Sequence, residues 1–445
     1  MGRDGPPPVT SPTSSSWPLA WLALAVAAAA FAVLTYDAWY GRLGFEALAV
    51  LAVAFAAFWF GRRGLTPGPR GSLDLIAKLL FTVVGMIALL RHPIPVEGGE
   101  LPIYDAIVQY LPYVDLRTFI LFGLLAMAIK ALGVVSSAFA WHLLLVGQGI
   151  RYPFWQAIMT AFLIGRFIGT FLPSTIGLDG YTLYEAGRYS NRWPRAVTAK
   201  ALEKLIGITG LFLGMVLTLP FGYQVIVDVT SHAGRPQAAP LLAAIIAAVG
   251  GGISLAVTAA LVWPTLLTRL MALFGNRLPG AVRGKVETLI EAVGAYHGQV
   301  GLLLAALFSK FMTHFTTAVV YYFTALAIGV VGAAFWPIVF GSTIQILGTI
   351  FSPTIAGEGA REAFQALLLH KQLGGVPQAV LSAALGFIAA EAATLWGGAF
   401  LLVRKPGWRP NFTLVDGQQV DYAWIDDREA VDFQAAAKMA ASAGR

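Results

Sequence analysis

Long apolar runs, separated by shorter polar loops, dominate the chain. A helix needs about 20 apolar residues to cross a bilayer. Runs of that length occur at 18–38, 44–60, 75–91, 118–144, 199–220, 240–263, 300–326 and 376–402. The pattern predicts an all-α polytopic membrane protein with about eight transmembrane helices. The Pro- and Ser-rich segment 1–17 is expected to be a disordered cytoplasmic tail, ahead of N-terminal transmembrane helices over 18–91.

Two further apolar stretches are interrupted by Pro and Gly. Pro173 and Gly177 in the first stretch match Pro353 and Gly357 in the second, 180 positions later. Pro removes a backbone donor and Gly favours a turn, so neither stretch is expected to run as one straight helix. Broken backbone at membrane depth must be buried in protein or line a water-filled cavity. We therefore predict two re-entrant hairpins.

The surroundings of the interrupted stretches, 155–188 and 336–372, repeat as well. Each stretch lies between two predicted crossings, and the single helix 240–263 separates the two sets. The second set is then expected to enter the membrane upside down relative to the first. Such an inverted repeat, with a broken segment in each half, is typical of transporters that bind their substrate near the bilayer midplane.

Composition and charge agree with a membrane protein. Hydrophobic residues make up 57% of the chain and charged residues 12%, which is too apolar for one water-soluble core. The absence of Cys excludes disulfides and thiolate metal sites. Basic residues group in alternate loops, which indicates cytoplasmic loops rather than a nucleic-acid partner. We expect a protein of the cytoplasmic (inner) membrane with both termini in the cytoplasm and residues 404–445 as a cytoplasmic tail.

Charged residues inside the apolar segments are candidate substrate contacts. Lys130 and Lys310 lie near the middle of their predicted helices, at the same offset of 180 residues. Each costs roughly 3 kcal/mol there unless it finds a partner or water. Glu391 is the expected counter-ion, and Glu203 is expected to pair with Lys204. The alternative is that these residues form ion pairs that only hold helices together, or that the Lys side chains reach outward to the interface.

Charged residues also follow the glycines of both hairpins. Asp179 does so in the first hairpin, and Glu358, Arg361 and Glu362 do so in the second. Spacings of three and four place the second group on one helical face. Arg361 is the preferred phosphate contact because its planar fork can make two bonds to phosphate oxygens. Arg166 is a weaker candidate, since it can simply lie at the cytoplasmic interface.

These motifs resemble the flippase-like transmembrane domain of lysylphosphatidylglycerol synthases, which also occurs as stand-alone proteins. The family's first motif is similar to FLP at 171–173 with GLD at 177–179, and its second to PT at 353–354 with GEGARE at 357–362. The resemblance covers 118–403. It implies a membrane domain that moves a phospholipid or a polyprenyl-phosphate-linked lipid between leaflets, with anionic lipid headgroups as partners.

The chain departs from the family pattern at two positions. Leu178 replaces the second Gly of the Gly-Gly-Asp turn. Thr182 replaces the Arg that the family commonly has three residues after the Asp. The segment 404–445 is too short for a soluble synthase domain, so lipid synthesis is not expected. The segment GRFIGTFLP at 165–173 also resembles DedA-type undecaprenyl-phosphate carriers, whose size and helix number fit less well.

An enzyme is the alternative function. A membrane-embedded transferase acting on a lipid-linked phosphate would use Asp179 or Glu362 as a base. The six histidines show no metal-ligand spacing, and no nucleotide-binding motif occurs. We therefore expect no metal and no cofactor, and transport is preferred to catalysis.

Overall fold

The computed structural model describes most of the chain after residue 84 and short pieces before it. The described residues are 57–58, 77–79, 82–83, 85–96, 99–171, 176–263, 265, 268–269, 271–272, 280–350, 352, 354, 357–405, 407–423 and 425. The predicted tail 1–17, most of the predicted helices over 18–91, and both Pro173 and Pro353 lie outside them.

The chain divides into two units, Met1–Ile103 and Tyr104–Arg445. In the first unit, strands β1 (Pro93–Val96) and β2 (Gly99–Pro102) pair antiparallel, with Ile94 opposite Leu101. The second unit begins one residue into helix α5 (Ile103–Tyr110) and contains all the candidate site residues.

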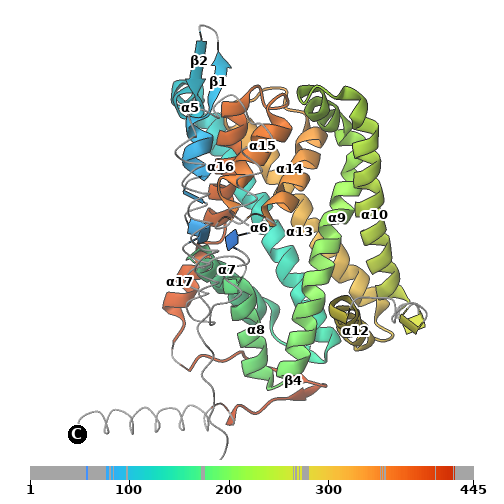
Figure 1. Cartoon of the computed structure of the whole chain (residues 1–445). Coiled ribbons are helices and arrows are strands. Elements are labelled where there is room, and N and C mark those ends of the chain that lie inside the picture. The colour runs from blue at the N-terminus through green and yellow to red at the C-terminus, as the bar shows by residue number, and fades with distance from the viewer. Residues whose placement is uncertain are drawn as a thin grey trace, which may run out of the picture. The chain divides into compact units, whose positions relative to one another are not determined.

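The second unit is almost entirely helical (Figure 1). After the turn η1 (Leu111–Tyr113), its elements are α6 (Leu116–Gly147), β3 (Ile150–Arg151), the π-helical turn η2 (Phe154–Met159), α7 (Thr160–Phe171), α8 (Ile176–Ser190), α9 (Trp193–His232), η3 (Pro236–Ala238), α10 (Ala239–Val262), α12 (Gly280–Gly294), α13 (Val300–Ala327), α14 (Phe335–Ile350), α15 (Ala360–Leu369), α16 (Val376–Ala392), α17 (Trp396–Val403), β4 (Leu414–Val415) and β5 (Gln418–Gln419).

Within the described residues, 5 helices are long and apolar enough to cross a membrane. They are α6, α9, α10 with η3, α13, and α16 together with α17. Each coincides with one of the crossings predicted from the apolar runs after residue 116. The structure is therefore that of an all-α membrane protein, while the total of eight crossings stays a prediction.

Two of these helices differ from the prediction. Helix α9 continues through Pro220 to His232, although the predicted crossing ends at 220. Pro in a transmembrane helix is tolerated where neighbouring helices hold the chain. Here α9 packs closely on α14 at Gly222. A Cβ at this position would lie 2.2 Å from Phe340 Cβ. The crossing predicted at 376–402 is divided by a tight turn, in which the Thr394 N–H bonds the Glu391 carbonyl three residues back.

Both interrupted stretches form pairs of packed helices, α7 with α8 and α14 with α15. Small residues bring the arms together. A Cβ at Gly177 would lie 2.5 Å from the backbone of Gly169, and one at Gly357 would lie 2.8 Å from Thr349 Cβ. Gly357 also has φ of +75°, which favours glycine. The two arms of each stretch therefore pack on each other, while the breaks at Pro173 and Pro353 and the entry into the membrane from opposite sides stay predictions.

The second unit has two halves, α6 to α9 and α13 to α17, and helices of one half pack on helices of the other. Helices α6 and α13 pack on each other. Helix α9, from the first half, packs on α14 of the second, and α17, from the second half, packs on α7 of the first. Helix α10 runs beside α9 (Figure 1). Residues of α6, α7, α9 and α13 contribute to the charged clusters described below.

The segment after α17 folds back onto the first half. Strand β4 pairs with β3 and β5, with Val415 opposite Ile150. Arg404 donates to Glu185 of α8 at 2.6 Å, and Arg195 of α9 pairs with Asp416 at 2.8 Å. The described part of the segment that the sequence predicts as a tail is therefore docked on the helical unit.

Candidate functional site

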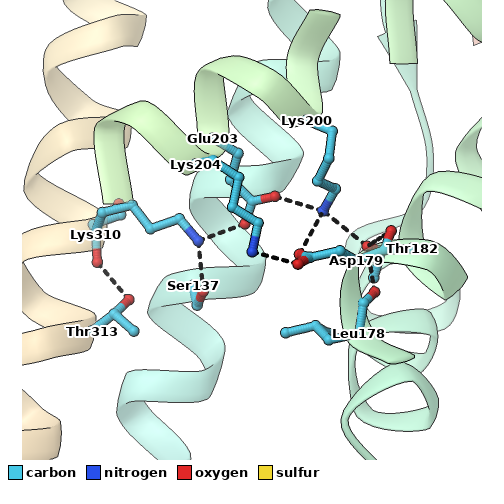
Figure 2. A network of polar contacts seen from close by, with 10 residues as sticks. Ser137, Leu178, Asp179, Thr182, Lys200, Glu203, Lys204, Lys310 and Thr313 are labelled. Carbon is cyan, nitrogen blue, oxygen red and sulfur yellow. Dashed lines mark hydrogen bonds and ion pairs between the residues drawn. The ribbon is translucent and has the colours of Figure 1, made fainter. Parts of the chain in front are cut away.

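A buried carboxylate joins two lysines between α6, α9 and α13 (Figure 2). Lys310 Nζ donates to Glu203 Oε1 at 2.5 Å and to Ser137 Oγ at 2.8 Å. Lys200 Nζ donates to the other oxygen of Glu203 at 2.5 Å and to Thr182 Oγ1 of α8 at 2.9 Å. Both oxygens of the Glu203 carboxylate are thus occupied by ammonium groups.

A second carboxylate extends this cluster to the start of α8. Asp179 forms an ion pair with Lys204 and lies 3.9 Å from Lys200 (Figure 2). The Lys200 ammonium also lies 3.8 Å from the centroid of the Trp141 ring. We call Asp179, Lys200, Glu203, Lys204 and Lys310 the first cluster.

The expected pairing of Glu203 with Lys204 is wrong. Adjacent residues on a helix do not face each other, so the two side chains point to different neighbours. Glu203 instead pairs with Lys310 and Lys200. Sequence reasoning missed Lys200, although its spacing of three from Glu203 and four from Lys204 places the three residues on one side of a helix.

The second cluster lies at the start of α15. Arg361 donates from Nη2 and Nε to Glu362 Oε1, at 2.7 Å and 3.0 Å. The other Glu362 oxygen accepts the backbone N–H of Gly359 at 2.7 Å, which satisfies a free donor at the helix start. The guanidinium carbon lies 4.3 Å from the centroid of the Phe387 ring. Both charged side chains are buried, and they form an ion pair with each other.

Glu358 is not on the helical face that the sequence predicted for it. Helix α15 begins at Ala360, and Glu358 lies in the turn between two glycines of positive φ, Gly357 and Gly359. The residue is half-buried. Glu358 therefore lies outside the helix that carries Arg361 and Glu362.

The third cluster brings together residues of α6, α7 and α16. Glu391 accepts from Thr170 Oγ1 at 2.6 Å, and its Oε1 lies 3.7 Å from Arg166 Nη2. Lys130 donates to Thr317 Oγ1 of α13 at 3.1 Å and lies within electrostatic range of Arg166 and Glu391. We call Lys130, Arg166 and Glu391 the third cluster.

Glu391 was expected to be the counter-ion of the mid-helix lysines, and for Lys310 this is wrong. Glu203 takes that place. Glu391 contacts α7 instead, because α17 packs on α7 and brings the end of α16 with it. No carboxylate forms an ion-pair contact with Lys130 in the part of the chain that the structure describes. Arg166, the weaker candidate from the sequence, belongs to this cluster.

The central helices α6 and α13 make a reciprocal pair of bonds. Lys130 of α6 donates to Thr317 of α13, and Lys310 of α13 donates to Ser137 of α6. Lys130 and Lys310 are 180 positions apart, and so are Ser137 and Thr317. This is the offset that separates the two Pro/Gly motifs.

Comparison with protein families agrees with the motifs. A family model described as lysylphosphatidylglycerol synthase TM region matches residues 105–399. The chain belongs to this family. No curated protein and no solved structure matches it. All three charged clusters of this lysylphosphatidylglycerol synthase TM-region protein lie within the matched residues, so they belong to the membrane domain that defines the family and that links the chain to membrane lipids.

Proposed function

We propose that the protein moves a phospholipid or a polyprenyl-phosphate-linked lipid between the leaflets of the cytoplasmic membrane. The observation that carries the proposal is the reciprocal bonding of α6 and α13. When two equivalent elements pack about a two-fold axis, a contact from i to j is accompanied by a contact from j to i. The bonds Lys130 to Thr317 and Lys310 to Ser137 follow this rule at the offset of the hairpin motifs.

The exchange of partners between the halves supports the same symmetry. The contact of α9 with α14 has its counterpart in the contact of α17 with α7. In an inverted repeat the two broken segments enter the membrane from opposite sides and approach each other near the midplane. On this proposal, α7 with α8 and α14 with α15 are the two re-entrant hairpins, and the charged clusters lie along the path of the headgroup.

A polar path would lower the main barrier to lipid transfer. A charged headgroup loses its hydration in hydrocarbon at a cost of many kcal/mol, whereas acyl tails can stay in the lipid throughout. Side chains of Asp179 and Lys204 are 20% and 48% exposed, and those of Arg166 and Glu391 are 26% and 22% exposed. On this proposal these residues meet the headgroup, while the enclosed residues Lys310, Glu203, Arg361 and Glu362 position them.

The test is lipid movement in vesicles reconstituted with the full chain. Vesicles contain a trace of phosphatidylglycerol with a fluorescent headgroup label, and dithionite quenches the label in the outer leaflet only. The proposal predicts that quenching goes beyond the outer-leaflet fraction in vesicles with protein, compared with empty vesicles. Equal quenching in both would contradict it.

The same vesicles separate transport from the alternative function. A transferase changes its lipid, whereas a flippase returns it chemically unchanged. Mass spectrometry of the labelled lipid, recovered before dithionite is added, should therefore show a single unmodified species. Conversion of the lipid, without faster quenching, would favour the transferase.

A further inference from the structure

We propose that Lys130 and Arg166 bind the phosphate group of the transported lipid. The inference rests on the proposed function and names the part of the headgroup that the third cluster recognises. The first observation is charge. The three residues of the cluster are two basic side chains and one carboxylate, with a formal net charge of +1. A phosphodiester carries one negative charge and would neutralise it.

The second observation is that the cationic groups lack strong partners. Lys130 is only 8% exposed, and its hydrogen-bond partner among the described residues is the neutral hydroxyl of Thr317. Arg166 Nε is buried without a hydrogen-bond partner there, and Nη2 is 3.7 Å from Glu391. Buried donors without partners are costly, and each one calls for an explanation. An anion held between Lys130 and Arg166 supplies that explanation.

The other buried cations serve as internal comparisons. Lys310, at the position equivalent to Lys130, already has Glu203 at 2.5 Å, and Arg361 already has Glu362 at 2.7 Å. The charge of each is therefore already compensated by a buried carboxylate, whereas that of Lys130 is not. This is why the assignment falls on Arg166 and Lys130 and not on Arg361, the phosphate contact that the sequence favoured.

The geometry of the groups suits a phosphate. A guanidinium offers a planar fork of N–H donors, and a Lys ammonium adds a compact charge. Arg166 and Glu391 are about a quarter exposed, so the cluster can be reached from outside. Glu391 lies where it competes with an incoming anion. Neutralising Glu391 should then strengthen anion binding, whereas neutralising Arg166 should weaken it.

The test compares these two variants, whose expected effects on anion affinity have opposite signs. The full chain in detergent micelles is titrated by calorimetry with dihexanoyl-phosphatidylglycerol, with inorganic phosphate, and with dihexanoylglycerol, which has no phosphate. We expect Arg166→Gln to weaken binding of dihexanoyl-phosphatidylglycerol by about tenfold or more, from the loss of a charge-assisted contact. We expect Glu391→Gln to tighten it several-fold.

Arg195→Gln is the matched control, because it removes the same charge from the exposed pair with Asp416. It should leave the affinity unchanged. Should Arg166→Gln fail to fold, as judged by its melting temperature, Arg166→Lys keeps the charge and loses the fork, and it should bind the lipid measurably more weakly than the native chain.

Three results would overturn the site. The first is a change in affinity of the same sign, or no change, for Arg166→Gln and Glu391→Gln. The second is binding of dihexanoylglycerol as tightly as of dihexanoyl-phosphatidylglycerol. The third is binding of inorganic phosphate alone, which would make free phosphate the ligand. Because binding needs no transport, a failure here is distinct from a failure of the native chain to move lipid in vesicles.

Discussion

Lys130 and Lys310 occupy equivalent positions in two packed helices, yet their surroundings differ. Lys310 has a carboxylate at 2.5 Å, and Lys130 has a hydroxyl at 3.1 Å. Both lysines are buried. The same position in a repeated fold thus holds an ion-paired lysine in one half and, in the other, a lysine bonded to a hydroxyl, for which we propose a ligand.

The largest expected effect comes from removing the carboxylate that compensates the first cluster. Glu203→Gln leaves Lys310 buried without its carboxylate and leaves Lys200 with only Asp179, 3.9 Å away. Loss of one member of a buried ion pair costs about 3–5 kcal/mol of unfolding free energy. The matched change Glu391→Gln, at a more exposed carboxylate, should cost much less. Thermal unfolding of both variants in detergent checks this, and equal losses would remove the distinction between the clusters.

The two lysines should respond differently to the same substitution. Lys310→Met breaks an ion pair and leaves Glu203 with Lys200 alone, so we expect a loss of about 2–3 kcal/mol. Lys130→Met removes a buried charge that has no carboxylate in contact, so stability should be unchanged or higher. Melting temperatures of the two variants measure the difference. Similar destabilisation by both would show that Lys130 is as structural as Lys310.

The contact inside the first hairpin should give a smaller effect. Gly177→Ala places a Cβ 2.5 Å from the backbone of Gly169, and such overpacking costs about 1–3 kcal/mol. Gly180→Ala, in the same helix, has no atom within 4 Å of the new Cβ and should be neutral or mildly stabilising. Unfolding midpoints of the pair check the prediction. A neutral Gly177→Ala would mean that the two arms do not pack this tightly.

The smallest effect is expected at the exposed pair of Arg195 and Asp416. Their side chains are 39% and 58% exposed, and ion pairs of this kind contribute about 0–1 kcal/mol. Arg195→Gln should therefore lower the melting temperature slightly, and the difference should shrink at high salt. A large loss that is independent of salt would show that the docked segment after α17 depends on this contact.

Helix positions were predictable from the sequence because burial in lipid demands long apolar runs. Pro and Gly act locally, so the sequence predicts where a helix can break. Pro220 was the exception. Nothing in the local sequence shows that α14 packs beside it and lets α9 continue.

Side-chain partners were predicted less well, because they depend on contacts between distant segments. The link between Lys310 and Glu203 spans 107 positions, and the one between Thr170 and Glu391 spans 221. Glu391 was assigned to the mid-helix lysines since it was the available acid in the last helix. In the structure α17 packs on α7, and Glu391 lies beside Arg166 and Thr170 of α7 instead. By contrast, the shared offset of Lys130 and Lys310 was visible in the sequence. In the structure these two lysines make the reciprocal bonds between α6 and α13.

The most direct test of the account is the rate of lipid movement by Lys130→Met in reconstituted vesicles. This variant should fold as stably as the native chain while lacking one of the two cations proposed to hold the phosphate. The account predicts movement of labelled phosphatidylglycerol that is at least about tenfold slower, which corresponds to about 1.4 kcal/mol. A native rate from a fully folded Lys130→Met protein would contradict it.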